Sequence, residues 1–193
     1  AQQGISTKKK SITREALSVA PLQTRRLGKT DLEVPILGYG SAPGGIGLSD
    51  NEAIKLLHRA IDLGVKYLDT APGYSRAHHQ VGQVLAERRD EVIVATKVPV
   101  NTSQEALDSI DTSLHDLGTD HVDIAYVHNL GSRDAERVFA EDGALSGLRE
   151  AKRTGRVRFI GFTSHCNTSQ SALVLAEHDV DVIMVPVNYG DQY

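Results

Sequence analysis

The sequence predicts an α/β fold built on a parallel sheet. Six short apolar runs alternate strictly with five segments of helical periodicity. Runs such as VIVA (92–95) and VIMV (182–185) contain no polar residue, which is typical of strands covered on both faces. Strict βα alternation favours either a doubly wound sheet or a barrel.

The N-terminal residues are predicted to form a flexible arm and then a hairpin. Residues 1–24 carry the short cluster Lys8–Lys10. The cluster lacks the interleaved aromatics or helical basic face of a nucleic-acid-binding segment, so nucleic acid is not a predicted partner. In RRLGKTDLEV the turn residues 28–31 separate two extended pieces, which indicates a hairpin. Residues 25–193 are interpreted as a single domain.

The predicted strands and helices follow the hairpin in order. The first strand candidate is 35–40, and a helix over 49–64 opens with the capping box Ser49 to Glu52 and ends at Gly64. The other strands are predicted at 65–69, 92–98, 122–128, 156–163 and 181–187, and the other helices at 78–89, 103–118, 143–155 and 169–178.

Composition excludes several classes of site. The single cysteine, Cys166, excludes an intrachain disulfide and a multi-cysteine zinc site. The eight histidines are scattered, so no metal is predicted. No apolar run reaches the roughly 20 residues that span a bilayer, so no membrane partner is predicted. A cytoplasmic location is favoured, and export stays open because the sequence starts at Ala1 rather than at Met.

Polar residues gather where successive predicted strands end. Asp69 ends the second strand, Lys97 nearly ends the third and His128 ends the fourth, while Thr163 and Ser164 lie at the end of the fifth. The carboxyl ends of parallel strands share one edge, where α/β proteins build their sites. Each residue also has an ordinary structural explanation, since Asp69 could cap a turn and His128 could be a core histidine.

Together these side chains suit the reduction of a carbonyl. A buried Lys97 needs an anionic partner, and Asp69 can supply it. A cation beside Tyr74 would stabilise its phenolate and make the phenol a usable general acid. His128 could then donate a hydrogen bond to the carbonyl oxygen as negative charge develops there.

Motifs along the chain resemble those of the aldo-keto reductase family over residues 25 to 190. They are RRLGKTDLEVPILGYG, YLDTAPGY, VIVATKV, VDIAYVHNL, GLREAKRTGRVRFIGFTSH and VPVNY. The resemblance implies a (β/α)8 TIM barrel and an NADP(H)-dependent oxidoreductase, with NAD(H) as the other possible cofactor, that reduces an aldehyde or ketone. It also implies a catalytic tetrad of Asp69, Tyr74, Lys97 and His128, and cofactor contacts from Ser41, Asp69, Thr163 and Ser164.

The sequence departs from the family pattern at several positions. Pro186 stands where a glutamine often holds the nicotinamide, and Ser164 replaces the usual asparagine of that contact. The chain supplies about six βα units, so the C-terminal part of the barrel is absent. We therefore expect the chain to be part of a longer protein, to bind cofactor poorly by itself, and to be prone to self-association through unpaired sheet edges.

Three other interpretations compete with this one. The protein could be a non-catalytic or redox-sensing subunit of the same fold, which weaker cofactor binding would suit. A Schiff-base aldolase would use Lys97 as its nucleophile. The glycines of GYGSAPGGIG (38–47) suggest a dinucleotide fingerprint, but Pro43 occupies the position of the third glycine, so these glycines are predicted to form a loop.

Overall fold

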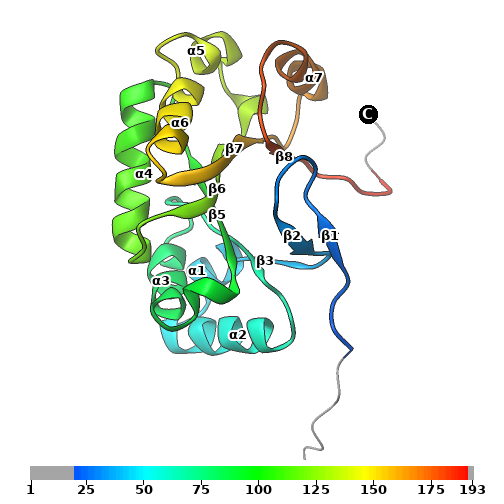
Figure 1. The fold of residues 1–193 in the computed structure, drawn as a ribbon, viewed down its shortest axis with the longest axis vertical. Helices are drawn as coiled ribbons and strands as arrows, with labels where there is room; N and C mark the ends of the chain where they lie inside the picture. Colours follow the sequence, from blue (N-terminus) through cyan, green and yellow to red (C-terminus); the bar gives the residue numbers. More distant parts are fainter. Residues whose placement is uncertain (1–19, 191–193) are drawn as a thin grey trace, which may run out of the picture.

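A curled parallel sheet organises the molecule, and a layer of helices covers its outer face (Figure 1). The computed structural model describes residues 20–190. The six strands pair in sequence order, and over the described residues β3 and β8 do not pair with each other. The sheet therefore forms part of a barrel, which is one of the two folds that the βα alternation favours and the one that the family resemblance implies. Its strands are β3 (Gly38–Gly40), β4 (Tyr67–Asp69), β5 (Ile93–Val98), β6 (Val122–Val127), β7 (Val157–Thr163) and β8 (Val182–Met184).

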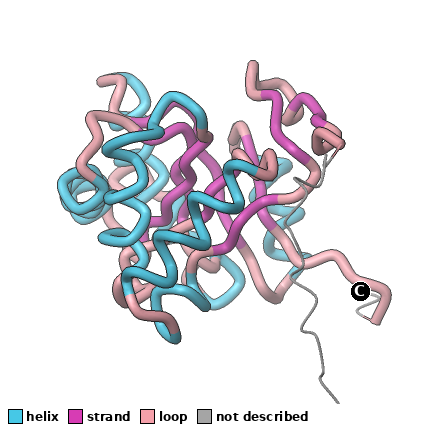
Figure 2. Tube along the Cα trace, turned by 90° about the horizontal axis from the view of Figure 1, so that it is seen from below, coloured by secondary structure: helices cyan, strands magenta, loops and turns pink. Residues whose placement is uncertain are grey.

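The five predicted helices are present within two residues of their expected bounds. They are α2 (Asp50–Asp62), α3 (Ala77–Arg88), α4 (Ser103–Leu117), α6 (Ala144–Arg153) and α7 (Thr168–Glu177). Helices α2, α3, α4 and α6 pack side by side in that order, around the strands (Figure 2). Their apolar faces and the outward residues of the strands form the larger hydrophobic core, which includes Leu57, Val81, Ile110, Leu148 and Val94. The capping box of Ser49 and Glu52 is confirmed at the start of α2.

Two short helices and one strand differ from the sequence-based predictions. Residues 42–47, predicted as a glycine-rich loop, form α1 (Ala42–Gly47), with Pro43 in its first turn, where a missing N–H costs nothing. Helix α5 (Ala135–Phe139) is capped by the Asp134 side chain. Single turns of 3₁₀ helix cover Arg89–Glu91 and Leu130–Ser132. The last strand ends at Met184 rather than at 187, and Pro186 lies just beyond it, without an N–H for a ladder.

The predicted hairpin is confirmed and covers the concave side of the sheet. Strands β1 (Thr24–Arg26) and β2 (Glu33–Pro35) pair antiparallel. Leu32 packs with Ala95, Ile124, Tyr126 and Val182 in a second, smaller core. The hairpin thus packs against the inward residues of the strands, with Leu32 as its buried contact. The arm predicted over 1–24 lies mostly outside the described residues, and Thr24 is already part of β1.

Close backbone approach between β7 and β8 depends on one glycine. A Cβ atom at Gly161 would lie only 1.6 Å from the carbonyl oxygen of Val182. Any side chain at this position would therefore separate the last two strands.

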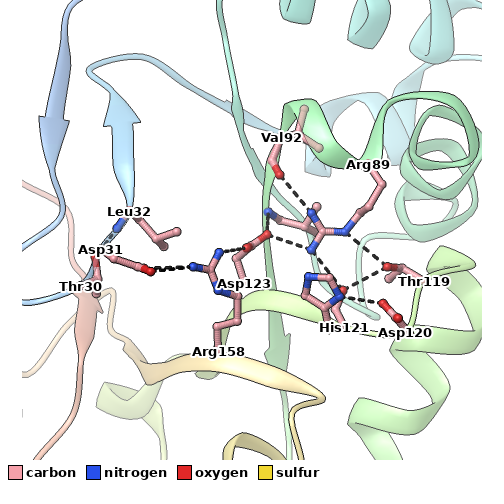
Figure 3. Close-up of polar contacts among 11 residues, drawn as sticks. Thr30, Asp31, Leu32, Arg89, Val92, Thr119, Asp120, His121, Asp123 and Arg158 are labelled. Carbon is pink, nitrogen blue, oxygen red and sulfur yellow. Dashed lines mark hydrogen bonds and ion pairs between the residues drawn. The ribbon is translucent and has the colours of Figure 1, made fainter.

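An ion network anchors the hairpin to the sheet (Figure 3). Asp123 of β6, whose side chain is 5% exposed, accepts hydrogen bonds from the Val94 N–H (2.9 Å), Arg89 Nη2 (3.0 Å) and Arg158 Nη1 (2.7 Å). The Nη2 of the same Arg158 binds both Asp31 oxygens at 3.0 and 3.1 Å. One buried carboxylate therefore links β5, β6, β7 and the hairpin loop at the amino ends of the strands.

Over residues 20–190, no helix has the length and apolarity that a membrane crossing requires.

We expect Asp123→Ala to lower the free energy of unfolding by roughly 2–3 kcal/mol, because it removes the buried acceptor that two guanidinium groups and one buried N–H share. Urea denaturation measures the change. Asp142→Ala is the matched control, since it removes the partner of Arg137 in an ion pair whose carboxylate is 76% exposed, and should change stability little. Equal losses in the two variants would show that the Asp123 network does not anchor the fold.

Candidate active site

Three of the predicted catalytic residues lie side by side at the carboxyl edge of the sheet. Asp69 is the last residue of β4, Lys97 lies one residue before the end of β5, and His128 directly follows β6. Strands β4, β5 and β6 are neighbours in the sheet. The parallel register thus brings to one edge residues that lie far apart in the sequence.

The buried ammonium of Lys97 is fully neutralised by oxygen atoms. Its residue is only 2% exposed. Nζ donates to Asp69 Oδ1 at 2.7 Å, to Asp69 Oδ2 at 2.6 Å and to the Thr70 carbonyl oxygen at 2.9 Å. Three donors therefore meet three acceptors, which offsets the cost of burying the charge. Burial raises the pKa of the Asp69 carboxyl, and the nearby Lys97 ammonium opposes that rise.

The ring of Tyr74 completes the group. Tyr74 lies in the turn between β4 and α3, and Lys97 Nζ is 4.7 Å from the centroid of its ring. The His128 ring meets the Tyr74 ring edge to face, with centroids 6.0 Å apart and planes at 80°. All four side chains predicted to be catalytic are thus brought together. Each group contacts the next, and the catalytic role of the four residues stays a prediction.

His128 is electrically neutral at physiological pH. Burial lowers the pKa of its imidazole from 6.5 to about 4, and the positive charges of Lys97 and Arg133 act in the same direction. A neutral imidazole keeps one N–H donor. It can hold a polar oxygen without adding a second full charge beside Lys97.

The turn that carries Tyr74 is fixed by the two preceding helices. Arg76 binds the Asp50 carboxylate of α2 through two guanidinium nitrogens, one of them at 2.7 Å. Helix α1 approaches so closely that a Cβ atom at Gly45 would lie 2.2 Å from the Tyr74 carbonyl oxygen. Between these contacts Ser75 adopts a left-handed backbone with φ of 52°, a conformation that needs such support.

The residues predicted to contact a cofactor lie at the same edge. Ser41 follows β3 and is 2% exposed, and its hydroxyl has no hydrogen-bond partner among the described residues. Thr163 ends β7, and its Oγ1 accepts from the Asn129 N–H at 2.8 Å. Ser164 donates from its N–H to the Met184 carbonyl oxygen at 3.0 Å and from Oγ to the Cys166 carbonyl oxygen at 2.5 Å. Their predicted role in cofactor binding stays a prediction.

Sequence analysis did not identify two residues of the loop after His128. Asn129 has a left-handed backbone with φ of 53°, and its Oδ1 accepts from the His165 N–H at 3.2 Å. Arg133 donates from Nε to the His128 carbonyl oxygen at 2.6 Å. Asparagine tolerates this backbone better than most residues, so its place directly after a strand is the signal that could have found it. The position of Arg133 depends on tertiary contacts alone.

The buried His78 lies outside this group. Its Nε2 is 3.2 Å from Thr96 Oγ1, on the helix side of β5, and burial lowers the pKa of its imidazole to about 4. Within residues 20–190, His, Cys, Asp and Glu side chains form no group of three that could hold a metal ion.

We expect Gly45→Ala to displace the Tyr74 turn, because the new methyl group would overlap the Tyr74 carbonyl oxygen. Amide hydrogen exchange should become faster over residues 74–77. Gly47→Ala is the matched control, since a Cβ atom at Gly47 of the same helix meets nothing within 4 Å. Unchanged exchange in Gly45→Ala would contradict the close contact.

The pKa of His128 gives a second prediction. Its imidazole should titrate near pH 4 in NMR spectra, whereas the unfolded chain should titrate near 6.5. Between these values the unfolded state binds more protons, so this group lowers the free energy of unfolding as the pH falls from about 6.5 to about 4. His128→Gln should therefore show a smaller loss of stability over that range than wild type. A midpoint near 6.5 in the folded protein would contradict the burial argument.

Comparisons with known proteins show what the chain is similar to. The model of the aldo/keto reductase family matches residues 36–192. The D-threo-aldose 1-dehydrogenase of a Pseudomonas species is 31% identical over 194 residues, which cover 82% of this chain and 58% of that protein. The chain spans about half the length of the curated relatives it matches.

Solved structures show the same similarity. A putative aldo-keto reductase from Pseudomonas aeruginosa superposes with a TM-score of 0.78 at 28% identity, over 90% of this chain and 72% of that chain. An aldo-keto reductase solved in complex with NADPH has a TM-score of 0.69 at 28% identity, over 86% of this chain and 55% of that chain.

Proposed function

This chain belongs to the aldo/keto reductase family, and we propose that it carries the catalytic residues of an NADP(H)-dependent oxidoreductase that reduces an aldehyde or ketone to an alcohol. The observation that carries the proposal is the contact of Tyr74 with both Lys97 and His128 at one edge of the sheet. A small carbonyl compound as substrate and a cytoplasmic location belong to the same proposal.

Each side chain has a distinct role in this reaction. NADPH, when bound, supplies the hydride that the carbonyl carbon receives. Tyr74 gives its phenolic proton to the carbonyl oxygen, so that the product is a neutral alcohol. Lys97 stabilises the phenolate that remains, and Asp69 keeps Lys97 in place and charged. Neutral His128 donates its N–H to the same carbonyl oxygen and fixes its orientation.

The residues at the edge of the sheet fit a polar cofactor. Ser41 presents a buried hydroxyl without a partner in the described part of the chain, and such groups are costly unless something binds them. Ser41, Asp69, Thr163 and Ser164 would hold the nicotinamide end. The relative solved with NADPH supports NADP(H) over NAD(H).

The hydrogen bonds of Lys97 argue against a Schiff-base aldolase. All three N–H donors are satisfied by oxygen acceptors, and two of these belong to a carboxylate, which favours the ammonium form. A Schiff base requires the neutral amine, which such a partner disfavours. A non-catalytic subunit would not need Tyr74 to be held between Lys97 and His128.

We expect Tyr74→Phe to lower NADPH-dependent reduction of an aldehyde panel by about 10²- to 10⁴-fold, since the general acid is lost. NADPH binding, followed by fluorescence titration, should stay unchanged. Tyr39→Phe is the matched control, because the Tyr39 ring packs in the helix-side core and should leave the rate unaltered. Equal activity of wild type and Tyr74→Phe would refute the proposed acid, and borohydride trapping of substrate on Lys97 would favour the aldolase.

A further inference from the structure

Arg133 lies next to the proposed catalytic residues but has no role in the reaction described above. It follows β6 by six residues, directly after the 3₁₀ turn Leu130–Ser132. Its guanidinium joins two loops of the carboxyl edge: Nε donates to the His128 carbonyl oxygen at 2.6 Å, and Nη1 donates to Asn101 Oδ1 at 2.9 Å. The positive charge is therefore held beside the residue that is proposed to orient the substrate oxygen.

Both acceptors of the Arg133 guanidinium are uncharged. Among residues 20–190, no carboxylate lies within salt-bridge distance of this side chain, and Nη2 donates no hydrogen bond. Arg133 is half-buried, and a partly desolvated cation without a counter-charge is costly. A protein gains from such a charge where an anionic ligand neutralises it.

Other arginines of the chain show the contrast. A carboxylate raises the pKa of each of Arg76, Arg88, Arg137, Arg153 and Arg158. Burial instead lowers the pKa of Arg133, and no neighbouring acid in the described part of the chain counteracts this effect. The nearby cation Lys97 is neutralised by Asp69. Of these two cations near His128, Arg133 is therefore the one without an acidic partner among the described residues, and its charge can attract an anion.

We propose that Arg133 binds an anionic group, a carboxylate or a phosphate, of the carbonyl substrate. The inference rests on the proposed reductase function and names the substrate class for the same site. A planar guanidinium offers parallel N–H donors that match two oxygens of such a group. The preferred substrates are then aldehydes or ketones that carry a negative charge, rather than neutral ones.

Matched aldehydes test this proposal. Succinate semialdehyde and butanal differ in a terminal carboxylate, as do 2-carboxybenzaldehyde and benzaldehyde. Wild type should show a higher kcat/KM for a charged member of these pairs. Arg133→Gln should lower kcat/KM for that compound by about 10- to 100-fold, the effect of losing a charge-assisted hydrogen bond. The neutral compounds should change less than about threefold, and Arg133→Lys should keep part of the preference.

Arg137→Gln is the matched control. It removes a guanidinium from the adjacent helix α5 that is already paired with Asp142, and should leave the preference for charged aldehydes intact. A proportional loss for charged and neutral substrates in Arg133→Gln would show that Arg133 only supports the loop, and would overturn the proposal. The proposal would also be overturned if wild type reduced neutral aldehydes and showed no preference for the charged ones.

Binding measurements separate this inference from the proposed function and from the cofactor. If the chain reduces none of the aldehydes, the reductase proposal fails. Calorimetry with succinate then tests the anion site separately. Binding to wild type that Arg133→Gln abolishes supports the anion site, whereas equal binding to both proteins, or binding to neither, overturns it. If Arg133→Gln instead weakens NADPH binding by more than about tenfold, the anion belongs to the cofactor and the substrate proposal is wrong.

Discussion

The buried ammonium of Lys97 is the constraint on which the rest of the site depends. An unpaired charge in that position would be too costly for a folded protein. Asp69, at the end of the neighbouring strand, and the carbonyl oxygen of Thr70, directly after it, satisfy it. The parallel register of β4 and β5 is therefore a chemical requirement as well as a packing arrangement. Tyr74 gains a nearby cation from the same geometry, since the chain returns over Lys97 only five residues after Asp69.

The two ends of the sheet differ in role. The amino ends carry contacts that support the fold, and the carboxyl ends carry the residues proposed to be catalytic. At the amino ends, Asp123 gathers two arginines and ties the hairpin to the strands. At the carboxyl ends, Asp69, Tyr74, Lys97 and His128 come together at one edge of the sheet. Helices α1 and α2 fix the Tyr74 turn, and Arg133 braces the loop behind His128. The groups proposed to react thus lie on strands or on turns held by neighbouring elements, an arrangement that preorganised catalysis requires.

Sequence patterns predict the strands, the main helices and the four residues of the site, because each depends on local order. Apolar runs with a polar residue at the end locate Asp69, Lys97 and His128, and the parallel topology then brings them together. Helix α1 escaped prediction because its glycines suggest a loop, although tertiary packing against the Tyr74 turn makes a helix favourable. The contacts of Arg133 and of the Asp50–Arg76 pair join distant segments, and no local pattern encodes them.

A double-mutant cycle on Asp69 and Lys97 tests the central claim most directly. The kcat/KM for aldehyde reduction is measured for wild type, Asp69→Asn, Lys97→Met and the double variant, each checked for folding by circular dichroism. If the pair acts as one unit, each single change should cost nearly as much as both together, roughly 10²-fold or more. Losses that multiply independently would contradict the account, because they would mean that Lys97 does not depend on Asp69 for its role.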